Sequence, residues 1–147
     1  MPRRWASTDK MQFVHVEPAR IERDWPVIAE ILAPAVQADP RQTLEGLHRR
    51  LETGADRLLA ISGPGHALMV IEVASDLVCW VKYLAGQIEG GPKARIATIR
   101  SVMAQLEAVA RNAGCTEIRL CGRDWSTILP TYRPFEGHRN GLMKELS

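Results

Sequence analysis

The chain has 147 residues, of which 46% are hydrophobic and 24% are charged, and its formal net charge is +2. This length and hydrophobic content predict one globular domain over residues 12–147, after a loose polar segment over residues 1–11. The near-neutral charge argues against a nucleic-acid partner, because such binders carry a clustered basic face. No apolar run approaches the roughly 20 residues that span a bilayer, so no membrane partner is expected.

The cysteines and histidines show no ligand pattern. Cys79, Cys115 and Cys121 are an odd number without paired spacing, which argues against a disulfide framework and a zinc site. The four histidines are scattered and show no HxxxH or HExxH pattern. We therefore expect no metal, and a reducing, cytoplasmic setting.

The N-terminal third predicts one strand followed by two helices. Residues 12–16 alternate in hydropathy, as a short strand does. The first helix is expected to start near Asp24 as its N-cap, because Pro26 fits a first turn better than a helix interior. A second helix is predicted over residues 43–53, with Gly54 ending it.

Three short apolar runs follow, over residues 57–62, 66–74 and 77–84. A Gly-Pro-Gly turn separates the first run from the second, and Ser75-Asp76 separates the second from the third. Short β-branched runs joined by tight turns predict an antiparallel meander.

The C-terminal half begins with the clearest helical pattern, over residues 94–113, where apolar side chains recur at three- and four-residue steps. A strand is predicted over residues 117–121 and a short helix over 125–131. A final strand over residues 142–146 would close the sheet.

The glycine-bearing loop between residues 84 and 94 is the most informative segment. It contains Gly86, Gly90 and Gly91, and it joins a strand to the N-terminus of a long helix. Loop N–H groups and the positive end of the helix dipole would point at one spot there. This arrangement predicts an anion cradle.

The order of elements, β-α-α-β-β-β-α-β-α-β, resembles the GNAT family of N-acetyltransferases over residues 12–146. That family carries a Gln/Arg-x-x-Gly-x-Gly/Ala loop after its fourth strand. Gln87 and Gly90 match this motif, whereas Pro92 stands where the family has glycine or alanine. A proline offers no N–H to a phosphate, although it suits the first turn of a helix.

The resemblance implies an α+β fold with a mixed, mostly antiparallel sheet flanked by helices. It also implies acetyl-CoA as the cofactor, an amine as the acceptor and direct transfer of the acetyl group. The residues that would hold acetyl-CoA are Tyr83, Leu84, Ala85, Gln87, Gly90, Gly91 and Lys93.

The same resemblance points to candidates for catalysis. Tyr132 looks like the family tyrosine that protonates the departing thiolate. The candidate bases are Glu72, Glu89 and Glu117. Glu72 lies in an apolar strand, where burial would make its carboxylate a stronger base; the alternative interpretation is that Glu72 lies on the solvated face of that strand. Lys82 stands where many members carry a glutamate, and a protonated lysine cannot accept a proton.

Two function classes stay open. The first is an acetyl-CoA-dependent N-acyltransferase. The second is a GNAT-fold protein that has lost catalysis and acts as a binding or assembly module, and the C-terminal tail resembles small GNAT-like proteins of tailed bacteriophages. Pro92 and Lys82 favour the second class. The sequence leaves a protein partner and a homodimer open.

Overall fold

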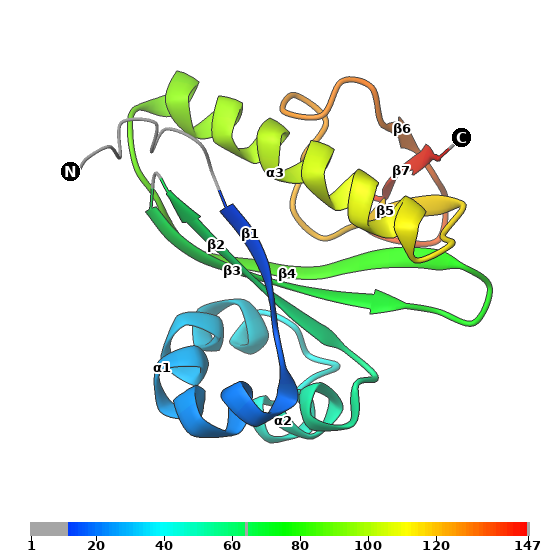
Figure 1. Cartoon of the computed structure of the whole chain (residues 1–147). Helices are drawn as coiled ribbons and strands as arrows, with labels where there is room; N and C mark the ends of the chain where they lie inside the picture. Colours follow the sequence, from blue (N-terminus) through cyan, green and yellow to red (C-terminus); the bar gives the residue numbers. More distant parts are fainter. Residues whose placement is uncertain (1–11, 64, 147) are drawn as a thin grey trace.

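The computed structural model describes residues 12–63 and 65–146 and forms a seven-stranded sheet with helices on both faces (Figure 1). The segment expected to be loose, residues 1–11, and Pro64 of the expected turn lie outside the described residues. The elements are β1 (Gln12–Val16), α1 (Pro18–Gln37), α2 (Leu44–Thr53), β2 (Arg57–Gly63), β3 (Gly65–Val73), β4 (Val78–Ile88), α3 (Pro92–Asn112), β5 (Glu117–Leu120), β6 (Arg133–Pro134) and β7 (Leu142–Glu145).

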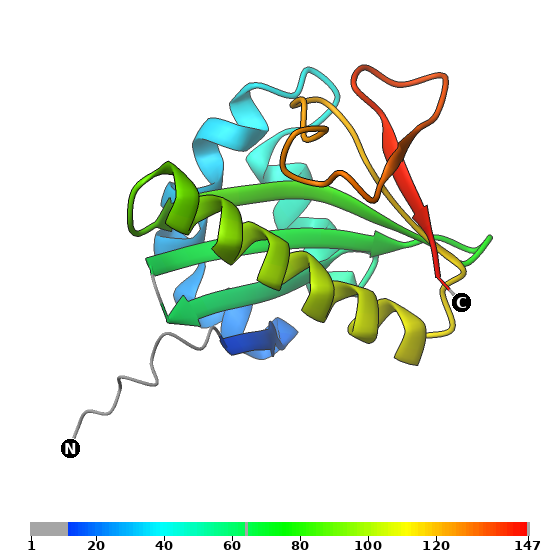
Figure 2. The same cartoon turned by 90° about the horizontal axis from the view of Figure 1, so that it is seen from above.

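The strand order in the sheet is β1-β2-β3-β4-β5-β7-β6. Only β4 and β5 pair in parallel, and the other five pairings are antiparallel. The mixed, mostly antiparallel sheet is therefore confirmed, as is the β2–β3–β4 meander. In both views α3 crosses one face of the sheet, while α1 and α2 cover the other (Figures 1 and 2).

Two apolar cores follow from this layering. One lies between the sheet and α3, and fully buried Leu106 and Ile118 belong to it. The other lies under α1 and α2 and contains fully buried Leu32, Leu47 and Leu58. Alternate residues of the central strands face opposite cores, which explains why β3 reads as a continuous apolar run instead of an alternating one.

Near its middle, β4 carries a β-bulge opposite β3 and separates from its other neighbour, β5. Tyr83 pairs with Val70 and Val81 pairs with Ile71, so Lys82 is one extra residue on the β4 side of this ladder. On the other side of β4, pairing with β5 stops at Val81–Leu120. The sheet therefore splits just where β4 bulges.

The first helix starts earlier than expected, so the prediction that Asp24 is its N-cap was wrong. The helix begins at Pro18, a proline at its first position, and continues through Pro26 and Pro34. An interior proline removes one backbone hydrogen bond and costs roughly 3 kcal/mol. Packing of the buried face of α1 against the sheet outweighs this cost.

The short helix expected over residues 125–131 does not form. Ile128 and Leu129 donate to the Trp125 carbonyl, but the chain continues as turns. Pro130 has no N–H to extend a helical ladder. The two-residue strand β6 follows instead and pairs with β7.

The glycine-bearing loop is shorter than expected because β4 runs on to Ile88. Gly91 is the N-cap of α3 and Pro92 is its first residue. The predicted second helix is confirmed, with Thr43 as N-cap and Gly54 in the left-handed conformation after it. Among the described residues, no helix combines the length and hydropathy needed to cross a membrane.

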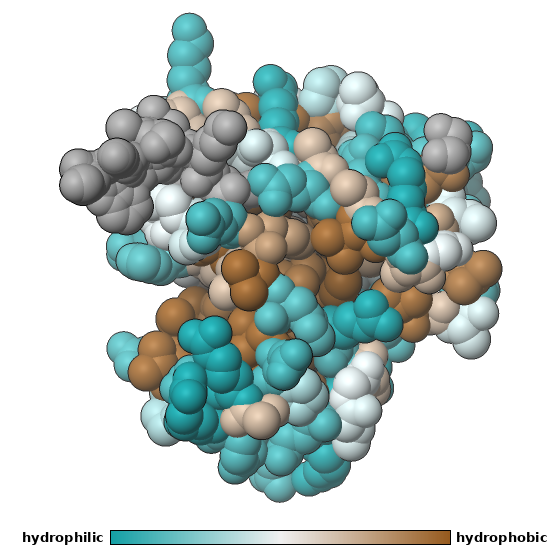
Figure 3. Space-filling view, viewed as in Figure 1, coloured by the Kyte–Doolittle hydropathy of each residue, from teal (hydrophilic) through white to brown (hydrophobic). Residues whose placement is uncertain are grey.

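The edge strand β1 lies on the face shown in Figure 3. Apolar side chains gather across the middle of this face, between the more polar surfaces of the helical layers. Val14 of β1 is 46% exposed.

The two glycines that flank the end of β4 should respond differently to substitution. A Cβ on Gly86 would lie 2.4 Å from the His66 carbonyl oxygen, and Gly86 has a φ of +114°. We expect Gly86→Ala to lower the free energy of unfolding by about 2 kcal/mol or more. Gly91 has a φ of −76° and open space around it. Gly91→Ala should change stability by less than about 1 kcal/mol.

Urea denaturation of both variants measures this difference. Equal stability of the two variants would contradict the close packing of β4 against β3 at Gly86.

Candidate functional site

The candidate site follows β4 from the point where its neighbour β5 ends. From Lys82 to Ile88, no strand pairs with β4 on that side within the described residues. Backbone N–H and C=O groups need hydrogen-bond partners, so this stretch presents unpaired groups to whatever lies beside it.

What lies beside this stretch is a pair of overlapping cavities of about 770 and 610 Å³, which we call the long groove. Leu84 and Ala85 of β4 line it, as do Ala35 and Ala38 from α1 and the loop after it. Trp125 contributes to both cavities from the segment after β5. The groove is thus bounded by elements from both halves of the chain.

One end of the long groove reaches the N-terminus of α3. No side chain caps this helix, so its first N–H groups, at Lys93 and Ala94, lack a side-chain partner. Arg95 lines the groove within the first turn, and Glu89 brings a carboxylate to the same end. The helix end and Arg95 together favour an anionic group there.

The structure brings most of the predicted cofactor residues to this groove. Leu84, Ala85 and Gln87 line it. Gly90, Gly91 and Lys93 lie between Glu89 and Arg95, which line its end. Tyr83 also lines the groove.

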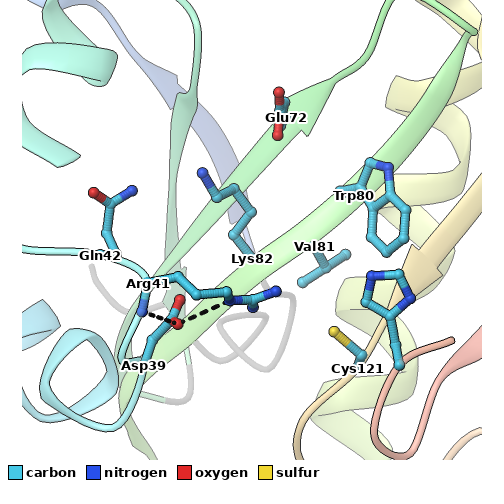
Figure 4. Close-up of a pocket in the computed structure, with 9 residues that line it drawn as sticks. Asp39, Arg41, Gln42, Glu72, Trp80, Val81, Lys82 and Cys121 are labelled. Carbon is cyan, nitrogen blue, oxygen red and sulfur yellow. Dashed lines mark hydrogen bonds and ion pairs between the residues drawn. The ribbon is translucent and has the colours of Figure 1, made fainter. Parts of the chain in front are cut away.

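The other end of the long groove opens into a cavity of about 280 Å³, the polar pocket. Its charged and aromatic side chains number six, and they come from the α1–α2 loop, β3, β4 and the β6–β7 loop (Figure 4). They are Asp39, Arg41, Glu72, Trp80, Lys82 and His138. Groove and pocket share the wall formed by Val81, Lys82 and Cys121.

The α1–α2 loop is tied to β4 by a short hydrogen bond. The Tyr83 hydroxyl donates to Asp39 Oδ2 at 2.6 Å, while Arg41 donates its backbone N–H and its Nε–H to Oδ1. Burial alone would raise the pKa of Asp39, but these hydrogen bonds outweigh it and hold the pKa below its ordinary value. Burial and the neighbouring carboxylate raise the pKa of Tyr83. The pair is therefore a carboxylate and a neutral phenol.

Glu72 belongs to an ion network instead of standing alone. Its Oε2 lies 3.1 Å from Arg50 Nη2, and its side chain is 35% exposed. Arg50 also forms two hydrogen bonds with Asp56, whose side chain is fully buried. Lys82 Nζ donates to the same Asp56 at 2.9 Å. Lys82 thus pairs with Asp56 and not with Glu72, and Asp56 joins α2 to the bulge of β4.

The structure does not bring Tyr132 to the groove or the pocket. Tyr132 is 6% exposed in the core under α3, and its hydroxyl donates to Glu107 at 2.8 Å. Burial and the contact with Glu107 raise the pKa of Tyr132. Lys144 closes this cluster with a 3.0 Å bond to Glu107.

Several pocket residues were not identified from the sequence. Asp39 and Arg41 stand after α1 in a turn without a recognisable motif, and His138 was one of the scattered histidines. His138 and Trp80 lie 5.0 Å apart between ring centroids. Cys121 is a free, partly exposed cysteine beside them. Only the folded arrangement places these five residues together.

One further cluster of metal-ligating side chain types lies elsewhere, on the α1–α2 surface. Ligand atoms of Glu22, His48 and Glu52 lie within 4.8 Å of one another. His48 already lies 3.0 Å from Glu22 and stacks on Trp25. None of these residues lines the groove or the pocket.

The mixed sheet, its parting after four parallel pairs and the groove along β4 define the GNAT fold. Comparison with solved structures supports this. N-acetylglutamate synthase from Neisseria gonorrhoeae, crystallised with coenzyme A and N-acetyl-glutamate, has a TM-score of 0.62 at 14% identity. The match covers 94% of this chain but only 35% of that one, so this chain spans about a third of that protein.

Two shorter structures match along their whole length. Aminoglycoside 6'-acetyltransferase type Ii has a TM-score of 0.64 at 8% identity, and 92% of this chain and 97% of that chain are covered. IAA acetyltransferase from Bacillus cereus has a TM-score of 0.60 at 11% identity, with 93% and 100% covered. No protein-family model and no curated protein matches the sequence. At these identities the likeness shows the fold.

Replacement of the buried carboxylate at position 56 should destabilise the fold. Asp56→Asn leaves Lys82 and Arg50 without their shared counter-ion beside the core. We expect the free energy of unfolding to fall by about 3 kcal/mol, which is the lower end of the range for breaking a buried ion pair. The loss is at this end because Arg50 is partly exposed and retains its ion pair with Glu72.

Asp24→Asn is the matched control, because Asp24 is an exposed carboxylate that also pairs with arginines. It should leave stability unchanged in the same urea titration. A similar loss in both variants would show that the Asp56 network does not hold α2 to β4.

The Asp39 hydrogen bonds predict a pH dependence. A carboxyl whose pKa is lowered by folding stabilises the protein above its unfolded pKa, and this contribution is lost as pH falls through the folded pKa. Asp39→Asn should therefore be less stable than the wild type at pH 7. The difference should shrink as pH falls from 5 to below the ordinary aspartate value of 3.8.

Denaturation at a series of pH values measures this effect. Tyr83→Phe removes one of the hydrogen bonds to Asp39 and should retain part of the pH dependence. A stability difference for Asp39→Asn that stays constant from pH 7 to pH 3 would contradict the assignment.

Proposed function

We propose that this protein is a GNAT-like acyltransferase that moves an acetyl group from acetyl-CoA to an amine by direct transfer. The observation that carries the proposal is the unpaired side of β4 from Lys82 to Ile88, which lines a groove that runs from the α3 N-terminus to the polar pocket. An extended, amide-bearing arm can pair with such a strand, and an anion can bind at such a helix end.

Each part of the groove suits one part of acetyl-CoA. The uncapped N–H groups of Lys93 and Ala94, with Arg95, would hold the pyrophosphate, and Gly91 leaves space for its approach. The β4 backbone at Tyr83, Leu84 and Ala85 would pair with the pantetheine amides. Gln87 lines the groove between these two regions.

Acetyl-CoA would supply an acetyl group activated as a thioester. The acceptor amine must lose a proton before it can attack, and Glu72 in the polar pocket is the proposed proton acceptor. Backbone N–H groups of β4 beyond Val81 would polarise the carbonyl oxygen. Tyr132 as the acid for the thiolate stays a prediction, and our proposal does not depend on it, because its hydroxyl is buried against Glu107.

The second candidate is a binding module without catalysis, for instance in phage assembly. Two features favour it: Pro92 removes one N–H from the α3 end, and Lys82 stands at the bulge where a carboxylate base would be useful. Such a protein would bind acetyl-CoA or a protein partner without releasing free thiol. Measuring acetyl-CoA binding and the release of free thiol together therefore distinguishes the two candidate functions.

Acetyl-CoA binding tests the proposal first. Calorimetry should detect binding to the wild type, and acetyl-CoA at 100 times its Kd should stabilise the fold by about 2.7 kcal/mol. Gly91→Glu should weaken binding about tenfold or more, since it places a carboxylate at the proposed pyrophosphate site.

Ala113→Glu is the matched control, because it adds the same charge at the opposite end of α3, about 30 Å away. It should bind like the wild type. Absence of any stabilisation at millimolar acetyl-CoA would reject the proposal, and unchanged affinity in Gly91→Glu would place the pyrophosphate elsewhere.

A further inference from the structure

The polar pocket has hydrogen-bonding groups that the protein itself leaves unused. Asp39 is not one of them. Its Oδ2 accepts from Tyr83 and its Oδ1 accepts twice from Arg41, so both carboxylate oxygens are occupied. Asp39 therefore holds the pocket wall together and offers little to a ligand.

The two cations of the pocket do have spare donors. Arg41 uses its Nε–H toward Asp39 at 3.2 Å, while its two terminal nitrogens have no partner among the described residues, and its side chain is 74% exposed. Lys82 Nζ makes one hydrogen bond, to Asp56, and has two further N–H groups. Spare cationic donors are suited to an anionic group, and the guanidinium fork of Arg41 matches a carboxylate.

Glu72 supplies the opposite charge. Its Oε2 is held by Arg50, and its Oε1 has no partner within the part of the chain that the structure describes. In Figure 4, Glu72 lies at one side of the pocket and Arg41 at another, with Lys82 between them and Trp80 on the remaining side. The His138 ring, which also lines the pocket, lies 5.0 Å from the Trp80 ring between centroids. The pocket thus presents one free carboxylate oxygen, two cations and an aromatic surface.

We propose that the acceptor is an amine that also carries a carboxylate, that is, an amino acid or a compound of that class. This inference rests on the proposed function. Glu72 would receive the ammonium group, and Arg41, supported by Lys82, would bind the carboxylate. The Trp80 ring would contact the carbon skeleton.

The same charges select against amines that carry only positive charge. A polyamine or an aminoglycoside would bring several ammonium groups against Arg41 and Lys82, and like charges at close range repel. Loss of the carboxylate would leave the Arg41 donors without their partner and remove the charge-assisted hydrogen bonds. Such bonds are worth about tenfold or more in affinity.

The test measures binding to the protein saturated with CoA. Ligand-observed NMR with each of the twenty amino acids identifies binders, and calorimetry then gives their Kd beside that of the matching amino-acid amide, in which the carboxylate is replaced by a neutral group. Kanamycin serves as the polycationic probe. At least one amino acid should bind about tenfold or more tightly than its amide and than kanamycin.

Arg41→Gln provides the second measurement. It should remove the preference for the acid over the amide in a protein that still folds and still binds CoA. A small loss of thermal stability is expected, because the Arg41 Nε–H bond to Asp39 is lost. Arg49→Gln is the matched control, because Arg49 is an exposed arginine on α2 that pairs with Glu45 and lines no part of the pocket. It should keep the full preference.

Three results would overturn the inference: no amino acid binds the CoA-loaded protein, the amide or kanamycin binds as tightly as the acid, or Arg41→Gln keeps the preference. Failure of CoA to bind is seen in the first titration and rejects the proposed function instead. The two failures are therefore distinguishable.

Discussion

Beyond the Val81–Leu120 pair, the backbone of β4 loses its neighbour on one side and keeps β3 on the other. Backbone polar groups cannot be left unpaired in an apolar interior, so the protein does not close over them. Instead α1 and the segment after β5 stand apart and leave the long groove. The bulge at Lys82 falls at the same point and aims Lys82 and Tyr83 toward the α1–α2 half. One interruption of the sheet thus creates the groove and positions the polar pocket beside it.

Two carboxylates fix the α1–α2 half of the chain against β4 beside the groove. Asp56 is buried and binds Arg50 and Lys82, while Asp39 binds Tyr83 and Arg41. Each one connects the α1–α2 half to neighbouring residues of β4. A buried charge without its partner is costly, so these contacts also fix where Lys82 and Arg41 can lie. The charges that a ligand would meet are those left over after this internal pairing.

Much of the fold could be read from the sequence, because periodicity and turn residues act locally. The meander, the second helix with its Gly54 stop and the glycine-bearing loop were predicted in this way. Pro26 was read as a helix start because the intrinsic cost of an interior proline is visible in the sequence, whereas the packing that outweighs it is not. Asp39, Arg41 and His138 could not be placed in a site, since the α1–α2 loop that holds the first two is far in the sequence from the β6–β7 loop that holds His138. Their proximity depends on the tertiary fold alone.

Along the long groove, β4 would contact a ligand through main-chain groups, which every residue type except proline provides in full. Side chains at these positions point above and below the sheet and are constrained by the cores instead. Sequence drift can therefore change nearly every residue of this strand while the recognition surface persists.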